Sequence, residues 1–249
     1  MAAERGSPRA RIYVVGIGYR SFDRKLREII LHSEVILASE RLFEIFKRCE
    51  EFGTVKDRVE VIDNVDATMN FIRQYVRPSE QGTSDPVRRT IVLLASGDPL
   101  FCGIGRRAVE EFGKEIVEIF PDLSSVQVAF AKIREPWDDA FLMSLHPGPA
   151  VRAKREPRYG IKDIPVLLRE HGKIAVLTGA ENNPARIAKE ILCSSDIGHA
   201  LSAIVMYVCE RLGYPDEKIT EGTVEDIAAM EFREPNVVII KVCPSVPHA

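Results

Sequence analysis

The chain has 249 residues, 45% of them hydrophobic and 29% charged, which is sufficient for one large or two medium globular domains. Its formal net charge of −3 provides no general positive field and argues against an enzyme of DNA or RNA. No run approaches the roughly 18 apolar residues of a membrane span, and the five cysteines lack the spacing of metal ligands or of a disulfide framework. We therefore expect a soluble, cytoplasmic protein that holds no metal.

Short apolar runs alternate with amphipathic helical patterns along the chain, which is typical of an α/β protein. Several runs are continuous, as expected for strands that are buried on both faces of a largely parallel sheet. The runs predict strands at 12–15, 35–37, 59–62, 91–94, 116–119, 174–177, 203–208 and 237–242. Apolar stripes predict helices near 26–30, 65–76 and 188–192, the last entered through Pro184, and Thr223 with Asp226 forms a predicted capping box.

Two polar stretches interrupt this pattern, at 78–89 and at 147–163. The second is longer, basic and rich in proline and glycine, which is typical of a loop. The apolar patterns on either side predict two α/β lobes, residues 1–120 and 121–249, with the boundary near Pro121.

The first predicted strand ends in a glycine turn, VVGIGYR, with Gly16 and Gly18. Glycine at such a turn lets the backbone approach a ligand closely. A dinucleotide fingerprint would need a third glycine where Ser21 stands. A plain turn from strand to helix is therefore the favoured interpretation over a nucleotide site.

A second glycine-rich segment, LLASGDPLFCGIG at 93–105, directly follows a buried strand. Ligands of open α/β sheets bind at the carboxyl ends of strands. Asp98 can accept hydrogen bonds from a ligand, or it can bond donors of its own loop. The composition alone favours neither ligand binding nor a purely structural loop.

Two later strand ends carry small polar residues before a helix. Ser124 and Ser125 follow a proline turn, and one of them is expected to cap the next helix. The other hydroxyl, or the free amides of that helix, can face a ligand. The segment AVLTGAENNPARIA repeats this arrangement in the second lobe, with Thr178, Gly179 and Ala180 at its turn.

The chain resembles the tetrapyrrole methylase family over residues 12–242. The resemblance rests on the segments above and on three more, PWDDA, SLH and CERLGYPDEKITEGTVEDIA. Loops with the sequence GDP occur across the family, whereas PWDDA and the ERLG segment in this order are more specific. The segments are most similar to those of the family's carbon-5 methylating branch. The resemblance implies an S-adenosylmethionine-dependent C-methyltransferase of cobalamin biosynthesis, which methylates carbon-5 of a precorrin or cobalt-precorrin.

The resemblance also implies a fold and a donor site. The expected fold has two α/β lobes, each around a mixed five-stranded sheet, with S-adenosylmethionine in the cleft between them and S-adenosylhomocysteine as its product. Proteins of this family are usually homodimers. The implied donor-binding residues are Gly97, Asp98, Phe101, Gly103, Ile104, Ser124, Ser125, Thr178, Gly179 and Ala180.

Two turns depart from the family pattern. The first usually reads Gly-x-Gly-Pro-Gly, whereas this chain has Tyr19 and Arg20 in the last two positions. The second usually reads Pro-Gly-x-Ser-Ser, whereas Asp122 replaces the glycine. Aspartate tolerates a positive φ angle better than most residues, at some cost. We expect both departures to affect substrate specificity more than donor binding.

Methyl transfer from a sulfonium to an electron-rich carbon needs little covalent help from the protein, so positioning can supply most of the rate. A base must still remove a proton from the substrate, and Asp98 and His146 are the candidates. We expect His146 to follow a helix, where a histidine is more often structural.

A corrin precursor carries many carboxylates, which predicts cationic side chains in the site. Candidates lie beside the first turn and in the long basic loop, where an ordinary solvated surface charge is the alternative interpretation. They are Arg20, Arg24, Lys25, Arg152, Lys154, Arg155 and Arg158.

Two alternative functions remain open at this point. One is a sister enzyme of the same fold that acts on uroporphyrinogen, diphthine or ribosomal RNA, and the other is a non-catalytic corrinoid-binding protein. We expect no nucleic acid or membrane partner. A fused carbon-15 methylating, decarboxylating domain would add roughly 150 residues, so we expect that activity on a separate partner protein.

Overall fold

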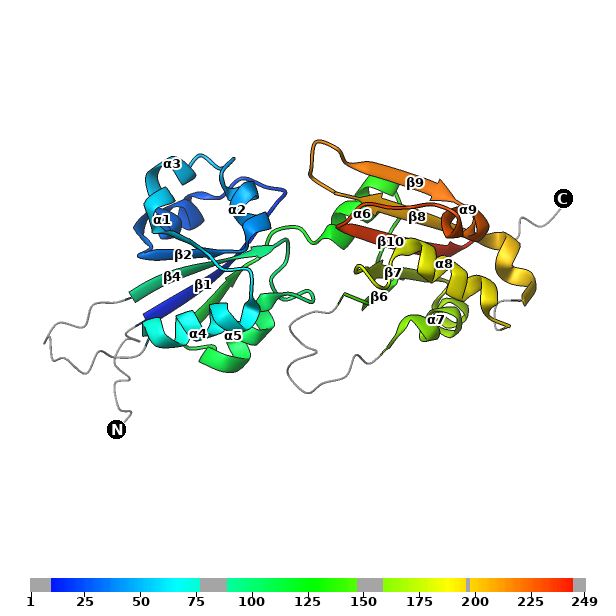
Figure 1. Cartoon of the computed structure of the whole chain (residues 1–249), viewed down its shortest axis with the longest axis horizontal. Helices are drawn as coiled ribbons and strands as arrows, with labels where there is room; N and C mark the ends of the chain where they lie inside the picture. The colour runs from blue at the N-terminus through cyan, green and yellow to red at the C-terminus, as the bar shows by residue number, and fades with distance from the viewer. Residues whose placement is uncertain (1–9, 77–88, 147–158, 196–197, 244–249) are drawn as a thin grey trace, which may run out of the picture. The chain divides into compact units, whose positions relative to one another are not determined.

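The computed structural model describes residues 10–76, 89–146, 159–195 and 198–243 (Figure 1). The chain forms two compact units, Met1–Ser124 and Ser125–Ala249. Each unit contains one five-stranded sheet, as expected. Most of the basic stretch, residues 147–158 with Arg152, Lys154, Arg155 and Arg158, lies outside the described residues.

The sheet of the first unit has the strand order β3-β2-β4-β1-β5, and every neighbouring pair is parallel. The expectation of a mixed sheet is therefore wrong for this unit. Each strand is joined to the next through at least one helix, and such crossovers return the chain in the same direction. The strands are β1 (Ala10–Ile17), β2 (Val35–Ala38), β3 (Val59–Val61), β4 (Arg89–Ser96) and β5 (Val117–Phe120).

Helices cover both faces of this sheet, which explains the continuous apolar runs of its strands (Figure 1). Ile12 and Val14 of β1 pack with α4 (Val65–Val76) and α5 (Ile104–Phe112). Val15 and Ile17 pack on the other face with α1 (Arg24–His32), α2 (Glu40–Phe46) and α3 (Phe52–Val55). A short 3-10 helix, η1 (Lys56–Arg58), leads into β3.

The sheet of the second unit has the order β6-β7-β10-β8-β9 and is mixed, as expected. Only β6 and β7 are parallel, and the remaining neighbours are antiparallel. The strands are β6 (Phe141–Ser144), β7 (Lys173–Leu177), β8 (Ile204–Glu210), β9 (Lys218–Gly222) and β10 (Asn236–Val242).

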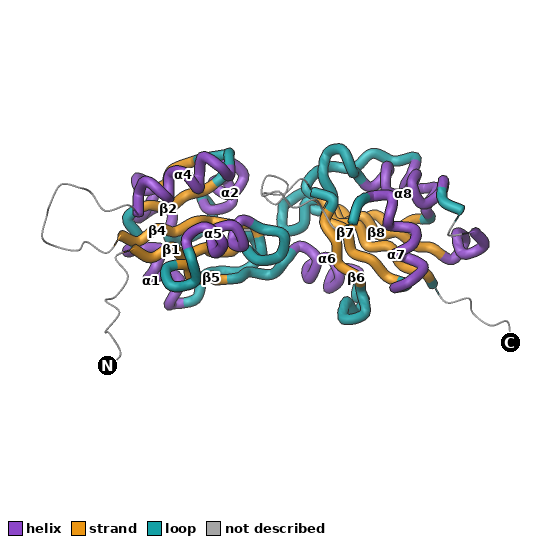
Figure 2. Tube along the Cα trace, turned by 90° about the horizontal axis from the view of Figure 1, so that it is seen from below, coloured by secondary structure: helices purple, strands orange, loops and turns teal. Residues whose placement is uncertain are grey.

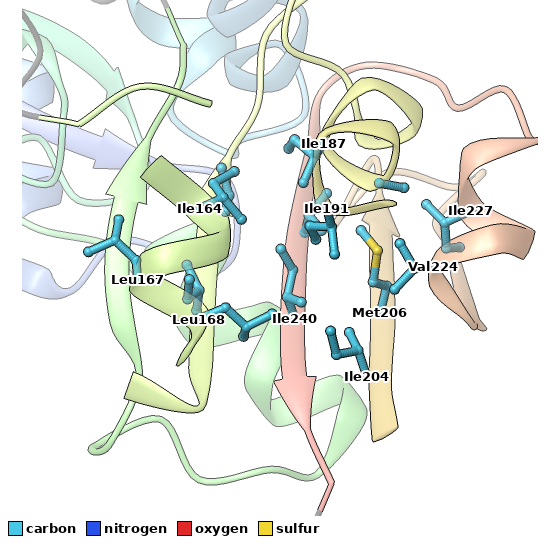
Figure 3. Packing of buried hydrophobic residues seen from close by; sticks show 14 of the residues in the cluster. Ile164, Leu167, Leu168, Ile187, Ile191, Ile204, Met206, Val224, Ile227 and Ile240 are labelled. Carbon is cyan, nitrogen blue, oxygen red and sulfur yellow. The ribbon is translucent and has the colours of Figure 1, made fainter. Parts of the chain in front are cut away.

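One face of this second sheet packs against α7 (Ile164–His171), α8 (Pro184–Cys193) and α9 (Val224–Ala228). Figure 3 shows Ile240 of β10 among the apolar side chains of α7 and α8. Replacing one such buried Ile or Leu with alanine typically costs about 2–5 kcal/mol. Two 3-10 helices, η3 (Ile161–Asp163) and η4 (Gly198–Ala203), precede α7 and β8.

The remaining helix of the described residues, α6 (Ser125–Ile133), contacts β10 and lies apart from α7 and α8 (Figure 2). Its buried side chains, Val126, Ala129 and Phe130, are not part of the cluster in Figure 3. Lys241 follows Ile240 on β10, so its side chain points to the opposite face of the sheet. Its Nζ donates to Glu135, just after α6, at 2.6 Å. Lys241 therefore ties α6 to the back of the sheet.

The predicted helix signals are confirmed where the structure describes them. Thr223 and Asp226 form the capping box of α9, and α8 begins with Pro184 after the N-cap Asn183. The apolar runs correctly predict eight strands but miss β6 and β9, which are edge strands with short or polar sequences. Across the described parts of the chain, no helix is long and apolar enough to cross a membrane.

Candidate active site

The carboxyl ends of β1 and β4 form the edge of the first sheet where a ligand site is expected. The two strands are neighbours, but α1 follows β1 on one face of the sheet and α5 follows β4 on the other. In open α/β sheets, such a switch point opens a crevice at the carboxyl ends of the strands, where ligands bind. The turn with Gly16 and Gly18 and the 97–105 loop both lie at this edge.

Three chain segments cross closely at this edge, at the ends of β1, β4 and β5. The Gly97 amide donates to the Ile17 carbonyl at 3.1 Å, and the Gly97 carbonyl accepts from the Asp122 amide at 3.2 Å. A Cβ on Gly16 would lie 1.9 Å from the Gly97 carbonyl oxygen, so only glycine fits there. Gly97 itself has φ +57°, a left-handed conformation that favours glycine.

The 97–105 loop is held by its own hydrogen bonds. Asp98 Oδ1 accepts from the Leu100 amide at 2.8 Å, and the Pro99 carbonyl accepts from the Gly105 amide at 2.9 Å. A Cβ on Gly103, the N-cap of α5, would lie 2.6 Å from the Pro99 carbonyl oxygen. The loop conformation therefore requires glycine at position 103. One carboxylate oxygen of the half-buried Asp98 is used to hold the loop.

The other Asp98 oxygen, Oδ2, receives no hydrogen bond or ion pair from the described residues. Beside it in sequence, Phe101 and Ile104 are half-buried, and Ile104 opens α5 and packs against the core. At the first turn, a Cβ on Gly18 would meet no atom within 4 Å. This edge thus combines open space with an oxygen able to accept hydrogen bonds.

Asp122 connects the two atypical turns. Its buried carboxylate accepts from the Tyr19 amide at 2.7 Å, the Arg20 amide at 3.3 Å and the Leu123 amide at 2.7 Å. Oδ1 also accepts from the Arg20 side chain, Nε, at 2.8 Å. Asp122 does not adopt a positive φ, so this position needs no glycine-like backbone. The aspartate instead provides the acceptor that fixes the first turn.

The cations near the first turn differ in what they contact. Arg24 forms an exposed pair with Glu28 of its own helix at 3.2 Å. Lys25 donates to Glu118 at 2.9 Å, and this hydrogen bond raises the pKa of Lys25 above its usual value. Arg20 is the cation that a buried carboxylate holds in place at this edge.

The serine pair lies where the two units join along the chain. Ser124 is buried and is the last residue of the first unit, and Ser125 is the first residue of α6. Ser124 thus occupies the position immediately before the helix, where a capping serine is expected.

In the second unit, the ends of the parallel strands β6 and β7 bring further predicted residues together. The Leu145 amide donates to the Leu177 carbonyl at 2.8 Å, and Asn182 Nδ2 donates to the Leu145 carbonyl at 3.5 Å. His146, the next residue, is exposed, and its amide donates to Ser144 Oγ at 3.3 Å. His146 follows a strand, so the expectation that it follows a helix is wrong.

The turn after β7 contains Thr178, Gly179 and Ala180. The buried Thr178 hydroxyl lies 2.5 Å from Asn236 Oδ1 and 2.9 Å from the Asn236 carbonyl oxygen on β10. That hydroxyl is therefore committed to joining β7 and β10. A ligand at this turn would meet the backbone of Gly179 and the exposed Ala180.

The more specific motifs of the sequence stabilise the second unit. In PWDDA, Asp139 accepts from the buried Lys173 Nζ at 2.7 Å, and this hydrogen bond lowers the pKa of Asp139. In the ERLG segment, Arg211 has φ +49° and pairs with Asp216 at 2.8 Å, which lowers the pKa of Asp216. Both motifs fix loops of this unit.

Residues 11–228 match the family model described as Tetrapyrrole (Corrin/Porphyrin) Methylases. The cobalt-precorrin-7 C(5)-methyltransferase of Salmonella typhimurium is 38% identical over 129 residues, which are 52% of this chain and 55% of that protein. The chain thus spans about half the length of that relative. The probable cobalt-precorrin-7 C(5)-methyltransferase of Methanocaldococcus jannaschii is 27% identical over 226 residues, 89% of this chain and 93% of that protein. The precorrin-6Y C(5,15)-methyltransferase (decarboxylating) of Mycobacterium tuberculosis is 28% identical over 170 residues, 67% of this chain and 38% of that protein.

Solved structures of low sequence identity share the fold. The precorrin-6Y methylase of cobalamin biosynthesis from Archaeoglobus fulgidus has a TM-score of 0.61 and 20% identity, covering 95% of this chain and 99% of that chain. The uroporphyrin-III C-methyl transferase of Thermus thermophilus, complexed with S-adenyl homocysteine, has a TM-score of 0.61 and 18% identity, covering 93% and 92%.

Proposed function

Because the chain belongs to the tetrapyrrole (corrin/porphyrin) methylases, we propose that it transfers a methyl group from S-adenosylmethionine to carbon-5 of a precorrin or cobalt-precorrin in cobalamin biosynthesis. The names of the relatives from Salmonella typhimurium and Methanocaldococcus jannaschii support this reaction. The complex of the Thermus thermophilus structure supports the choice of donor.

The observation that carries the proposal is the crossing of three strand ends in the first unit. Gly16 and Gly97 bring backbone together at the switch point of a parallel sheet, where such folds bind ligands. This edge offers open space beside Gly18 and a carboxylate oxygen of Asp98. These features suit a donor with amino and ribose groups that donate hydrogen bonds.

In this proposal, the 97–105 loop holds the donor through Gly97, Asp98 and the backbone near Phe101, Gly103 and Ile104. Gly103 contributes by permitting the shape of the loop, since its Cβ position is taken by Pro99. Roles for Ser124, Ser125, Thr178, Gly179 and Ala180 in donor binding stay predictions from the family resemblance, as does a donor site in the cleft between the lobes.

When bound, S-adenosylmethionine supplies a methyl group that is already activated on a sulfonium sulfur. The protein's part is to align that methyl group with carbon-5, exclude water and accept the proton that the substrate loses. Two groups are proposed for the proton: Asp98, through the oxygen that is free of the Leu100 amide, and the exposed His146.

We further propose that the protein acts as a homodimer in the cytoplasm. The relative from Mycobacterium tuberculosis is named for methylation at both carbon-5 and carbon-15, and the match covers 38% of its length. We therefore propose that the matched residues serve the carbon-5 reaction and that a separate domain or partner protein carries out the carbon-15 reaction.

The test is incubation of the purified protein with S-adenosylmethionine and either cobalt-containing or metal-free precorrin-7, followed by mass spectrometry of the tetrapyrrole. The proposal predicts a product heavier by one methyl-for-hydrogen exchange and an equal amount of S-adenosylhomocysteine. Binding of the tetrapyrrole without either product would favour the non-catalytic alternative. Methylation of uroporphyrinogen, diphthine or ribosomal RNA in its place would favour a sister enzyme.

A further inference from the structure

The guanidinium of Arg20 has two edges able to bind an oxygen pair, and one of them is already used. Its side edge donates from Nε to Asp122 at 2.8 Å and from Nη2 to the Pro121 carbonyl at 3.1 Å. The end edge, formed by Nη1 and the second hydrogen of Nη2, has no partner among the described residues. The end edge of a guanidinium matches the two oxygens of a carboxylate.

Asp122 holds the Arg20 guanidinium in place without neutralising its charge. Its side chain is 4% exposed, whereas that of Arg20 is 57% exposed. Three backbone amides also donate to the same carboxylate, so its negative charge is shared among four donors. An arginine that is held on one side loses less side-chain entropy when it binds an anion on the other.

The position of Arg20 relates this edge to the candidate site. Arg20 lies two residues after Gly18, where a Cβ would meet no atom within 4 Å. The turn follows β1 at the switch point of the first sheet. The neighbouring cations Arg24 and Lys25 pair with Glu28 and Glu118.

We infer that Arg20 binds a peripheral carboxylate of the tetrapyrrole substrate through its end edge, and that Asp122 is the positioning residue that aims it. The inference rests on the proposed function and names the substrate group that the first turn recognises. It also gives one cause to both departures from the family pattern: the aspartate of the second turn holds the arginine of the first.

The first experiment measures methyl-transfer kinetics of Arg20→Ala and Arg20→Lys on precorrin-7. We expect Arg20→Ala to raise the acceptor KM about tenfold, with kcat within about twofold and the Kd of S-adenosylhomocysteine unchanged. Lysine keeps the charge but not the paired donors, so Arg20→Lys should fall between the two. The matched control is Arg73→Ala, which removes an arginine of similar exposure that pairs with Glu111 between two helices. This control should leave the acceptor KM unchanged.

The positioning role is tested with Asp122→Asn, which keeps the shape but removes the charge. It should raise the acceptor KM toward the Arg20→Ala value, and the double variant should show no further increase, because the two residues act as one unit. An equal change in acceptor KM and donor Kd would overturn the inference, since it would indicate a collapsed turn. An unchanged KM for Arg20→Ala would overturn it as well.

A binding measurement separates this inference from the proposed reaction. Uroporphyrin III, a polycarboxylate tetrapyrrole, is titrated by its fluorescence, with its methyl ester as the uncharged control. We expect about tenfold weaker binding of the acid by Arg20→Ala than by the wild type, and no difference for the ester. Such a result without any methyl transfer would support the inference and contradict the proposed function. Equal binding of the acid by both proteins, or no binding by either, would overturn the inference.

Discussion

Arg20 and Asp122 are 102 residues apart in the sequence, yet Arg20 Nε donates to Asp122 Oδ1 at 2.8 Å. The same carboxylate accepts from the backbone amides of Tyr19 and Arg20. The turn after β1 is therefore fixed by a residue that follows β5, and the edge of the first sheet behaves as one unit.

This relationship predicts unequal effects of its two members on stability. Asp122→Ala should lower the free energy of unfolding by about 2–4 kcal/mol, because it removes the acceptor of three backbone amides. Arg20→Ala should cost about 1 kcal/mol or less, because the arginine is largely exposed. Urea unfolding followed by circular dichroism measures both, with Glu28→Ala of the exposed Arg24 pair as a control that should change little.

Hydrogen exchange checks the cause of that difference. In Asp122→Ala, the amides of Tyr19 and Arg20 should exchange faster than in the wild type, and those of β2 should not. Equal stability of the two variants, or unchanged exchange at the first turn, would contradict the role given to Asp122.

The contact between Gly16 and Gly97 predicts strict intolerance to a side chain. Gly16→Ala would place a methyl carbon 1.9 Å from the Gly97 carbonyl oxygen, so the strand ends must separate. We expect a loss of about 3 kcal/mol or more, or failure to fold. Gly53→Ala is the matched control, because a Cβ there meets no atom within 4 Å. A melting temperature of Gly16→Ala equal to that of the wild type would contradict this close contact between Gly16 and Gly97.

Much of the fold could be predicted from the residues, because burial on both faces leaves a visible pattern. The runs at 12–15 and 91–94 are continuous since helices cover both sides of β1 and β4. In contrast, β9 is a polar edge strand, and its sequence KITEG shows no such pattern. The continuous runs indicated a largely parallel sheet, and the mixed sheet expected for the first unit came from the family resemblance. The order of the strands could not be predicted, because it depends on long-range pairing.

Less of the candidate site than of the fold could be predicted from the sequence. The glycine loops could be recognised, but not that Gly103 is required by the Pro99 carbonyl within its own loop. Tyr19, Arg20 and Asp122 are each visible as departures from a pattern. Their pairing depends on the adjacency of β1 and β5, which no local spacing reveals. The only sign of this pairing in the sequence is that the first and second turns depart from the family pattern in the same chain.

Cysteine labelling offers a test of the donor position in the first unit. Cys102 is exposed within the 97–105 loop, Cys193 is exposed on α8, and burial raises the pKa of Cys209 to about 12. With iodoacetamide at pH 8, Cys102 and Cys193 should be alkylated while Cys209 stays unmodified.

Addition of S-adenosylhomocysteine should slow alkylation of Cys102 severalfold and leave Cys193 unchanged, as followed by peptide mass spectrometry. If saturating S-adenosylhomocysteine protects neither cysteine, the donor does not bind against this loop.

The Asp139–Lys173 pair predicts a pH dependence of stability. The hydrogen bond from Lys173 holds the pKa of Asp139 below its usual value of roughly 3.9. This stabilisation is present above that value and is lost as the pH falls through the lower pKa of the folded protein. Asp139→Asn should therefore be less stable than the wild type at pH 7, and the difference should shrink below about pH 4. Urea unfolding at a series of pH values tests this, and a difference that is constant down to the acid limit would contradict it.

Methylation at carbon-5 can be located in the product by isotope labelling of the transferred methyl group. The protein is incubated with S-adenosylmethionine carrying a ¹³C methyl group and with precorrin-7 or its cobalt form, and the product is examined by NMR. We expect one labelled methyl group, whose protons show a long-range correlation to carbon-5 of the macrocycle. A label attached at carbon-15 or to oxygen, or unlabelled tetrapyrrole from a correctly folded protein that binds S-adenosylhomocysteine, would contradict it.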